Sequence, residues 1–568
     1  MSLHHTQRIH RLVNLEILSR VLSRVLFVIG ITIYFTTTAT TLGLAADPPT
    51  GVTSHARQVT PVELNASLFK KATDIEAWIT SKKRQDMQAH GWQMFAACMG
   101  LTDQRDPFDL SQFLRVYDTW QSIDDVLVGA EANASATAGA SKAAVAKRTE
   151  SFVRRLKPVT QLRVRKAADG PSASTNPPAS TLVSDVRYSP SLASDIISFV
   201  IKPGEAETSP DYYVLRSRRD ELRKSMKPLD KWEWNEDEDN FPNLHAVMLK
   251  PSYSIISHQG PTVLTYWSED VKVTNPKNDT EWQPPQNAPG VANERWWEAE
   301  VVVVPELTVT SANRPKVYDR FGQILPVVSL RAFHYFKLTA DQADALNETR
   351  DELHLPNKAE AGDFAVLVAM HVATHEISDW TWQTFWWSPM RINTAKQLND
   401  WGVPDDVAEM FYEPRRGTEL LAHFRLAIGY SFVEGKVGND FVPQPNQPSI
   451  ICSNPYLEGP FGPANFGGVD RFLTDEKVLP GSSHRTHLGV KSNCVSCHRA
   501  AAYPAFLGAT PPQNYPQQPD PLMNYVDYGF LKGDEETLFK DRVKTNYIWS
   551  VANKVSEKDF GTAPPPKK

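Results

Sequence analysis

Apolar residues recur with a helical period near the start of the chain. Between Glu63 and about Leu127 they return every three or four positions, first at Phe69, Ile75, Trp78 and Ile79, and again at Trp92, Phe95 and Met99. This spacing is typical of helices with one buried face. It predicts an N-terminal helical segment with a break at Asp106-Pro107.

The pattern changes to short β-branched and aromatic runs from Thr181 onward. These runs are bounded by Pro, Gly and Asp and predict strands at 196–201, 212–215, 262–267 and 298–304. Alternating residues extend the pattern over 327–338. Thr339, with Gln342 three positions later, then predicts a capped helix start.

A third segment combines an apolar run with histidines and tryptophans. Phe364 to Met370 is apolar enough for a buried strand. His371 and His375 follow on one face, whether the segment is helix or strand, and Glu376 comes next. This segment has three possible interpretations. It contacts a cofactor, through iron ligation or as an aromatic wall; it forms a separate His/Glu metal site; or it is a core strand with hydrogen-bonded histidines. Five large rings then follow at Trp380, Trp382, Phe385, Trp386 and Trp387.

These patterns predict an α+β fold in five parts. Residues 1–46 form a leader, 47–128 a helical segment and 129–182 an Ala-, Ser- and Pro-rich linker. Residues 183–440 form a β-rich central body, and 441–568 a loop-rich, partly helical C-terminal segment.

Bulk composition excludes one class of partner. The chain has 568 residues, is 22% charged and has a net charge of −6. It therefore lacks the basic footprint of a nucleic-acid-binding protein. The 15 Trp and 42 Pro residues are typical of aromatic-lined pockets and long ordered loops.

The N-terminus has the features of an export signal. Arginines at positions 8, 11, 20 and 24 precede an apolar run over 25–35, and small residues end it at Ala45-Ala46. The run is shorter than the ~20 residues of a membrane span. It predicts export to the bacterial periplasm, with an uncleaved membrane anchor as the alternative.

One pentapeptide carries the most specific chemistry. Cys494-Val495-Ser496-Cys497-His498 is a Cys-x-x-Cys-His run, the attachment signature of a c-type haem. Two thiols at this spacing can each bond one haem vinyl group, and the following imidazole can ligate the iron. We therefore expect one covalent haem c on Cys494 and Cys497, with His498 as the proximal ligand.

Two other readings of the pentapeptide remain. His484 and His487 lie just upstream and complete a Cys₂His₂ set for zinc. A redox dithiol is the other reading, although it is expected within a βαβ pattern. The remaining cysteines, Cys98 and Cys452, are either a disulfide in an oxidising compartment or independent buried thiols.

The chain also resembles a known family. The residues that carry the resemblance run from Met370 to Trp387, from Asn454 to Glu458 and from Asn493 to Ala500. They are similar to large exported bacterial cytochrome c-domain proteins with a single haem motif near the C-terminus. The resemblance covers roughly residues 290–550. It implies haem binding by Cys494 and Cys497, iron ligation by His498, electron transfer as the activity, and a cytochrome c-like C-terminal segment.

The sixth iron ligand separates the candidate functions. Met523 is the one Met downstream of the motif, in a short Pro-rich stretch unlike an ordinary cytochrome c domain. Upstream candidates are His371, His375, His484 and His487, and an open iron is the third option.

With two protein ligands, the protein is an electron carrier for a redox partner protein. With an open or exchangeable position, it is a peroxidase-like haem oxidoreductase. A binding protein with a purely structural haem is a further option. The sequence favours the carrier and assigns no catalytic residue.

Overall fold

The structure is a computed structural model. It describes residues 59–123, 125–126, 156–158, 182–200, 245–268, 297–310, 314–318, 324–352, 358–413, 417–431, 434–437, 450, 452, 454–457, 494–499, 502–503 and 543–544. All of them belong to the second of two units, Ala56–Lys568, into which the chain divides after His55. The leader, the strand expected at 212–215 and the candidate ligands Met523, His484 and His487 lie outside the described residues.

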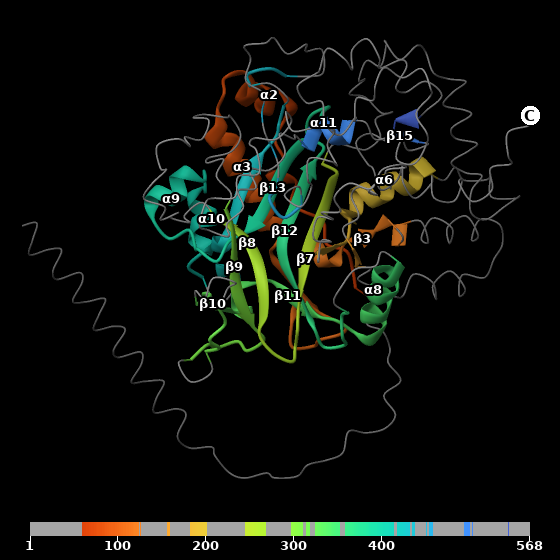
Figure 1. The fold of residues 1–568 in the computed structure, drawn as a ribbon. Coiled ribbons are helices and arrows are strands. Elements are labelled where there is room, and N and C mark those ends of the chain that lie inside the picture. Colours follow the sequence, from red (N-terminus) through yellow and green to blue (C-terminus); the bar gives the residue numbers. More distant parts are fainter. Residues whose placement is uncertain are drawn as a thin grey trace, which may run out of the picture. The chain divides into compact units, whose positions relative to one another are not determined.

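A nine-stranded antiparallel sheet forms the centre of the described fold (Figure 1). Its main order is β14 (Phe424–Ile428), β13 (Thr381–Trp387), β12 (Phe364–Thr374), β7 (Val247–Ile256), β5 (Leu182–Ser184) and β4 (Lys157–Pro158). Off this path, β11 (Tyr335–Lys337) pairs with β12, and β6 (Arg187–Tyr188) pairs with β7 and with β3 (Gln121–Ser122). The predicted buried strand at Phe364 is confirmed as β12.

Strands β12 and β13 are covered on both faces. Every residue of β13 is buried, and within β12 only His371 is partly exposed. An antiparallel strand with one solvent-exposed face would alternate apolar and polar residues, whereas a strand that is covered on both faces can be apolar throughout. Consecutive side chains of these strands therefore point into two different packed layers.

The N-terminal helices cover one of these faces. Helix α2 (Ala72–Thr80) leads into α3 (Arg84–Cys98), where the Phe95 ring stacks on Phe385 of β13 with centroids 4.0 Å apart. A Cβ atom at Gly91 would lie 3.0 Å from Cγ of Gln383, so glycine permits the close approach of α3 to the sheet. The helical segment and the β-rich body consequently share one core.

The helical prediction does not extend to Leu127. After α3 the chain forms strands β1 (Leu101–Arg105) and β2 (Phe113–Arg115), which pair with each other, and then β3. The Asp106-Pro107 break falls in the turn between β1 and β2. The apolar residues beyond it are spaced for short strands and turns rather than for another helix.

The strand predicted at 196–201 is wrong, because α6 (Pro190–Val200) covers most of this stretch. The Ser189 hydroxyl accepts a hydrogen bond from the Leu192 amide (3.3 Å), and Pro190 occupies the first helical position. Leu192, Ala193 and Ile196 recur at helical spacing and are buried. The start signals and this periodicity outweigh the β-branched composition of the run.

A second, three-stranded sheet confirms two strand predictions. It contains β8 (Thr262–Ser268), β9 (Trp297–Val304) and β10 (Val327–Ser329), in the order β10-β9-β8. The pattern predicted over 327–338 is interrupted by a 3₁₀ turn at Leu330–Ala332. On one side β10 pairs with β9, and on the other β11 pairs with β12 of the larger sheet.

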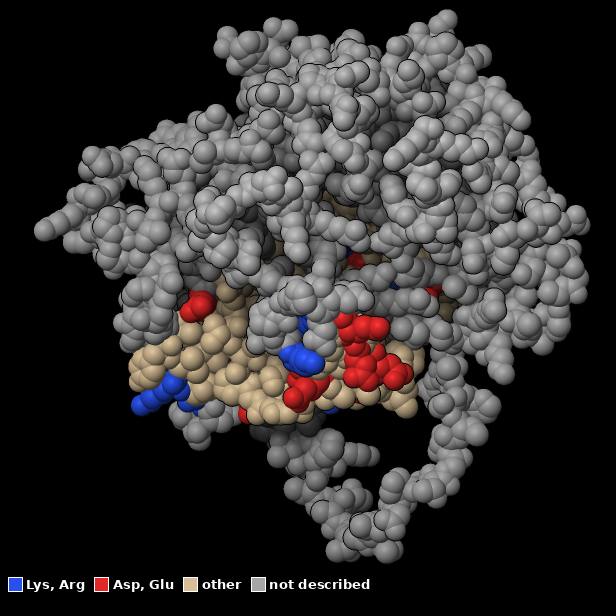
Figure 2. Space-filling view, turned by 45° about the vertical axis from the view of Figure 1, so that its right-hand side comes forward, with Lys and Arg blue, Asp and Glu red and all other residues tan. Residues whose placement is uncertain are grey.

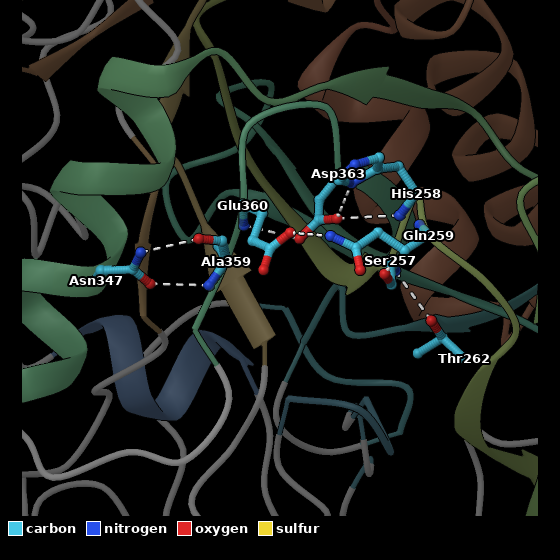
Figure 3. A network of polar contacts seen from close by, with 8 residues as sticks. All are labelled: Ser257, His258, Gln259, Thr262, Asn347, Ala359, Glu360 and Asp363. Atoms are coloured by element: carbon cyan, nitrogen blue, oxygen red, sulfur yellow. Dashed lines mark hydrogen bonds and ion pairs between the residues drawn. The ribbon is translucent and has the colours of Figure 1, made fainter.

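Polar contacts tie the β7–β8 turn to the loop before β12 (Figure 3). The Asp363 carboxylate accepts hydrogen bonds from the backbone amides of His258 (3.0 Å) and Glu360 (2.8 Å), and it lies 2.8 Å from Nδ1 of His258. Asn347 exchanges two hydrogen bonds with the backbone of Ala359, both 2.8 Å long. These contacts fix the entry into β12.

Helix α8 (Ala340–Glu352) confirms the predicted capping box. The Thr339 amide donates to Oε1 of Gln342 (2.9 Å), and the Gln342 amide donates to Oγ1 of Thr339 (3.3 Å). The outer side of α8 exposes Asp341, Asp344 and Glu348. Figure 2 shows acidic side chains gathering on this side of the described surface.

The observed fold is thus α+β with a β-rich body. Within the expected linker 129–182, Lys157–Pro158 and Leu182 join the central sheet. In the C-terminal segment, Val543–Lys544 forms strand β16, which pairs with β15 (Ala502–Tyr503). Among the described helices, none has the length and apolar character needed to cross a bilayer.

We predict that Gly402→Ala destabilises the protein. Gly402 ends α9 (Ala395–Asp400) in a Schellman motif, with φ +61° and a hydrogen bond to the Asn399 carbonyl (3.1 Å). An added Cβ would lie 2.5 Å from Cβ of Gln88. Strain and overpacking should lower the free energy of unfolding by about 2 kcal/mol or more in urea titrations.

Gly260→Ala is the matched control for this prediction. No heavy atom lies within 4 Å of a Cβ at Gly260. Its effect should stay below about 0.5 kcal/mol. Equal effects of the two substitutions would contradict the role given to Gly402.

Candidate functional site

The Cys-x-x-Cys-His run folds as helix α11 (Cys494–Arg499). Cys494 and Cys497 are three positions apart in the sequence, and His498 follows directly. Val495 is fully buried, while Cys494 and His498 are partly exposed. The helix therefore packs on the protein through Val495, while Cys494 and His498 stay in part accessible.

The surface under α11 is apolar and aromatic. Val495 packs in a cluster with Ala373 of β12, Trp382 of β13 and residues of α6. The His498 ring lies against the Trp382 ring with centroids 4.3 Å apart. Because Trp382 is itself fixed by a hydrogen bond from Nε1 to the Asp379 carbonyl (2.9 Å), it limits where the imidazole can turn.

Helices α11 and α3 contact opposite faces of β13. Trp382 contacts α11, whereas Phe385, three positions along the same strand, stacks on α3. Side chains three positions apart on a strand point to opposite faces. The sheet thus separates the pentapeptide from the N-terminal helices.

His371 and His375 both lie on the α11 side. His371 and Ala373 are two positions apart on β12, so they share a face, and Ala373 belongs to the α11 cluster. His375 follows the strand, and its ring lies 5.0 Å from the Trp380 ring. His375 is buried, whereas His371 is partly exposed.

Trp380 occupies an unusual backbone conformation between these histidines and Trp382. Its φ is +60°, and its ring lies 6.3 Å from Trp382. For a bulky residue this conformation costs about 1–3 kcal/mol and persists only where the surroundings enforce it. It positions the indole between the rings of His375 and Trp382.

A closed ring of buried polar side chains lies on the opposite, α3 side. Oε1 of Glu376 accepts a hydrogen bond from the Lys70 amide (2.6 Å) and lies 3.2 Å from Nε2 of His90. Nδ1 of His90 lies 2.7 Å from the Tyr430 hydroxyl, which accepts from Nε2 of Gln383 (2.8 Å). Nε2 of Gln383 also donates to Thr381 (2.9 Å), and Thr374 connects Thr381 to Glu376.

The ring has one consistent set of proton positions when Glu376 is ionised. The Thr374 hydroxyl then donates to Glu376, Thr381 donates to Thr374, and Tyr430 donates to Nδ1 of His90. This leaves the His90 proton on Nε2, facing Glu376. A buried carboxylate is tolerated here because each of its neighbours can donate.

The pKa shifts agree with this assignment. Burial raises the pKa of Glu376, but contacts with His90, Thr374 and the Lys70 amide outweigh burial and hold the pKa below its ordinary value. Burial, together with the Glu376 charge, raises the pKa of Tyr430 well above its ordinary value. Tyr430 therefore keeps its proton and can donate it.

The proposed His/Glu metal site at 371–376 is not formed. His375 and Glu376 are consecutive, and Glu376 turns to His90 while the His375 ring lies against Trp380 in a tilted contact. Over the ranges that the structure describes, no group of three or more His, Cys, Asp or Glu side chains could hold a metal ion. The zinc reading with His484 and His487 lies outside these ranges.

The two remaining cysteines do not pair with each other. Cys98 and Cys452 are both buried free thiols. Burial raises the pKa of Cys98, which keeps this thiol protonated and unreactive. Sγ of Cys452 lies instead 3.4 Å from Sγ of Cys494.

Sequence reasoning missed His90, Gln383 and Tyr430. Each lies within an apolar segment, and their convergence depends on how α3, β13 and the end of β14 pack. One sequence feature indicated such residues. Glu376 lies within a segment predicted to be buried, and a buried carboxylate needs hydrogen-bond donors around it.

No family model matches the chain, and no curated protein or solved structure gives a significant match. The function therefore has to be argued from the residues of this chain.

We predict that Glu376→Gln changes the acid stability of the protein. Because its folded-state pKa is lowered, ionised Glu376 contributes stability above the ordinary pKa of about 4.5, and this contribution is lost as pH falls through the folded value. Between about pH 5 and pH 3 the wild type should lose more unfolding free energy than the variant.

Urea titrations at several pH values measure this difference, with exposed Glu409→Gln as the control. Parallel pH profiles for wild type and Glu376→Gln would refute an ionised Glu376 in the folded protein.

Proposed function

We propose that this protein is an exported c-type cytochrome that carries one covalent haem and exchanges electrons with a partner protein. Cys494 and Cys497 would hold the haem, and His498 would ligate its iron. The supporting observation is the placement of His498 against Trp382 on an apolar sheet face, within the helix that contains the Cys-x-x-Cys-His run.

The residues present fit this group. Two thiols and an imidazole are the chemical set that covalent haem attachment requires. Apolar and aromatic side chains under α11 provide the low-polarity surroundings that suit a porphyrin face. A bound haem supplies one-electron chemistry.

The aromatic side chains have a further role in this proposal. From His498 a series of rings leads through Trp382 and Trp380 to His375, with centroid distances of 4.3, 6.3 and 5.0 Å. The His375 carbonyl accepts from the amide of His245, an exposed residue whose ring stacks on Phe69. This series offers an electron a path of closely spaced π systems toward the protein surface.

Of the two upstream histidines that the structure describes, His371 is a better candidate for the sixth iron ligand than His375. It lies on the sheet face that carries α11, and it is the one residue of β12 that is not buried. A six-coordinate iron favours electron transfer over small-molecule chemistry. If no side chain fills the sixth position, the second candidate is a peroxidase-like haem oxidoreductase.

We predict that protein matured in the periplasm carries haem that resists acid-acetone extraction and gives a low-spin, six-coordinate spectrum. Cys494→Ala combined with Cys497→Ala should abolish covalent haem, whereas Cys98→Ala should retain it. Carbon monoxide should leave the reduced spectrum unchanged. Colourless wild-type protein would refute the proposal, and carbon monoxide binding would favour the oxidoreductase.

We further predict that His371→Ala gives a high-spin spectrum and carbon monoxide binding, with the haem still covalent. Met523→Ala should leave the spectrum unchanged if His371 is the ligand. The reverse pattern would assign Met523, and no change in either variant would exclude both residues. Ultraviolet–visible and magnetic circular dichroism spectra distinguish these results.

A further inference from the structure

A second thiol lies beside the first cysteine of the pentapeptide. Sγ of Cys494 lies 3.4 Å from Sγ of Cys452 and 3.4 Å from the Cys452 carbonyl oxygen. Neither cysteine forms a disulfide in the structure. Since bonded sulfurs are about 2.05 Å apart, the two atoms would need to approach by little more than about one ångström.

Cys452 is held in place by the segment that follows it. Nδ2 of the buried Asn454 side chain donates to Oγ1 of Thr384 (2.7 Å) and to the Phe385 carbonyl (2.9 Å). The Tyr456 hydroxyl donates to the Trp387 carbonyl (3.2 Å). These contacts fix the segment along β13, so the Cys452 thiol has a defined position relative to α11.

Cys494 is the accessible member of the pair. Cys452 is 1% exposed, whereas Cys494 is partly exposed and packs against both apolar clusters of the sheet. An external disulfide can therefore form a mixed disulfide with Cys494 first, which releases one thiol. The neighbouring Cys452 thiol can then attack Cys494 and release the second thiol. Cys98 lies in α3, on the other side of the sheet.

We propose that Cys452 and Cys494 form a disulfide in the haem-free chain, and that this bond must be reduced before Cys494 can hold haem. The second half rests on the proposed function. In disulfide formation the two thiols give up two protons and two electrons to an external disulfide, which becomes two thiols. Haem attachment instead adds the Cys494 S–H across a vinyl group, so the two reactions compete for one sulfur.

The test uses the full chain, produced without haem maturation and treated with oxidised glutathione. Iodoacetamide blocks the remaining thiols after denaturation, and peptide mass spectrometry maps the sulfurs. Most chains should contain a cross-linked peptide pair carrying Cys452 and Cys494, two hydrogens lighter than the reduced peptides. Alkylation of both residues, or a Cys494–Cys497 bond, would overturn the inference.

Two variants separate pairing from folding. Cys452→Ala should leave Cys494 alkylated, and Cys494→Ala should leave Cys452 alkylated. Because each substitution removes the cross-link, the test needs only one of the two variants to fold. Cys98→Ala is the matched control and should retain the cross-link. Loss of the cross-link in Cys98→Ala would contradict the assignment.

A second arm tests the competition in cells that attach haem. When reductant is limiting, Cys452→Ala should raise the haem-bearing share of chains at least twofold over wild type, and added dithiothreitol should remove the difference. Equal loading without dithiothreitol would refute the competition. Colourless protein with an intact Cys452–Cys494 bond would refute the proposed function and leave the disulfide standing.

Discussion

The pairing of β12 with β13, covered on both faces, is the constraint on which the rest of the structure depends. Each side chain of these strands is assigned to one of two layers by alternation alone. Ala373 and Trp382 face α11, and Gln383 and Phe385 face α3. A shift of one residue in this register would exchange the two sets, so the strands must be held firmly.

The two layers solve different physical problems. On the α3 side a buried carboxylate is retained because His90, Thr374 and the Lys70 amide surround it with donors. Removing one partner from such a network leaves further buried groups unpaired, which costs stability. This ring fixes the end of β12, and with it the position of His375 and Trp380 on the other side.

On the α11 side the sheet presents rings and methyl groups rather than charges. The proposed haem ligand His498 meets this layer and His371 of β12 lies on the same face, while the thiol of Cys452 lies against Cys494 of α11. Such a surface favours a planar apolar cofactor over a hydrated metal ion. It also brings into contact two thiols that are 42 positions apart in the chain.

The sequence by itself determined the features that depend on neighbouring residues. Hydrophobic period and caps predicted α3, β12, β8, β9 and the capping box of α8, and residue spacing alone identified the pentapeptide. The sequence did not predict the structure correctly where a partner far away in the chain decides which element a segment forms. The 327–338 run is divided between two sheets. The 196–201 run, predicted as a strand, lies mostly in α6 because the buried residues of this segment recur at helical spacing.

Only the tertiary structure decided that Glu376 faces His90 and Tyr430, that His371 shares a face with α11, and that Cys452 meets Cys494 rather than Cys98. These contacts join residues far apart in the chain, and packing of whole layers creates them. No local propensity encodes such a meeting, because its free energy exists only once the layers have closed.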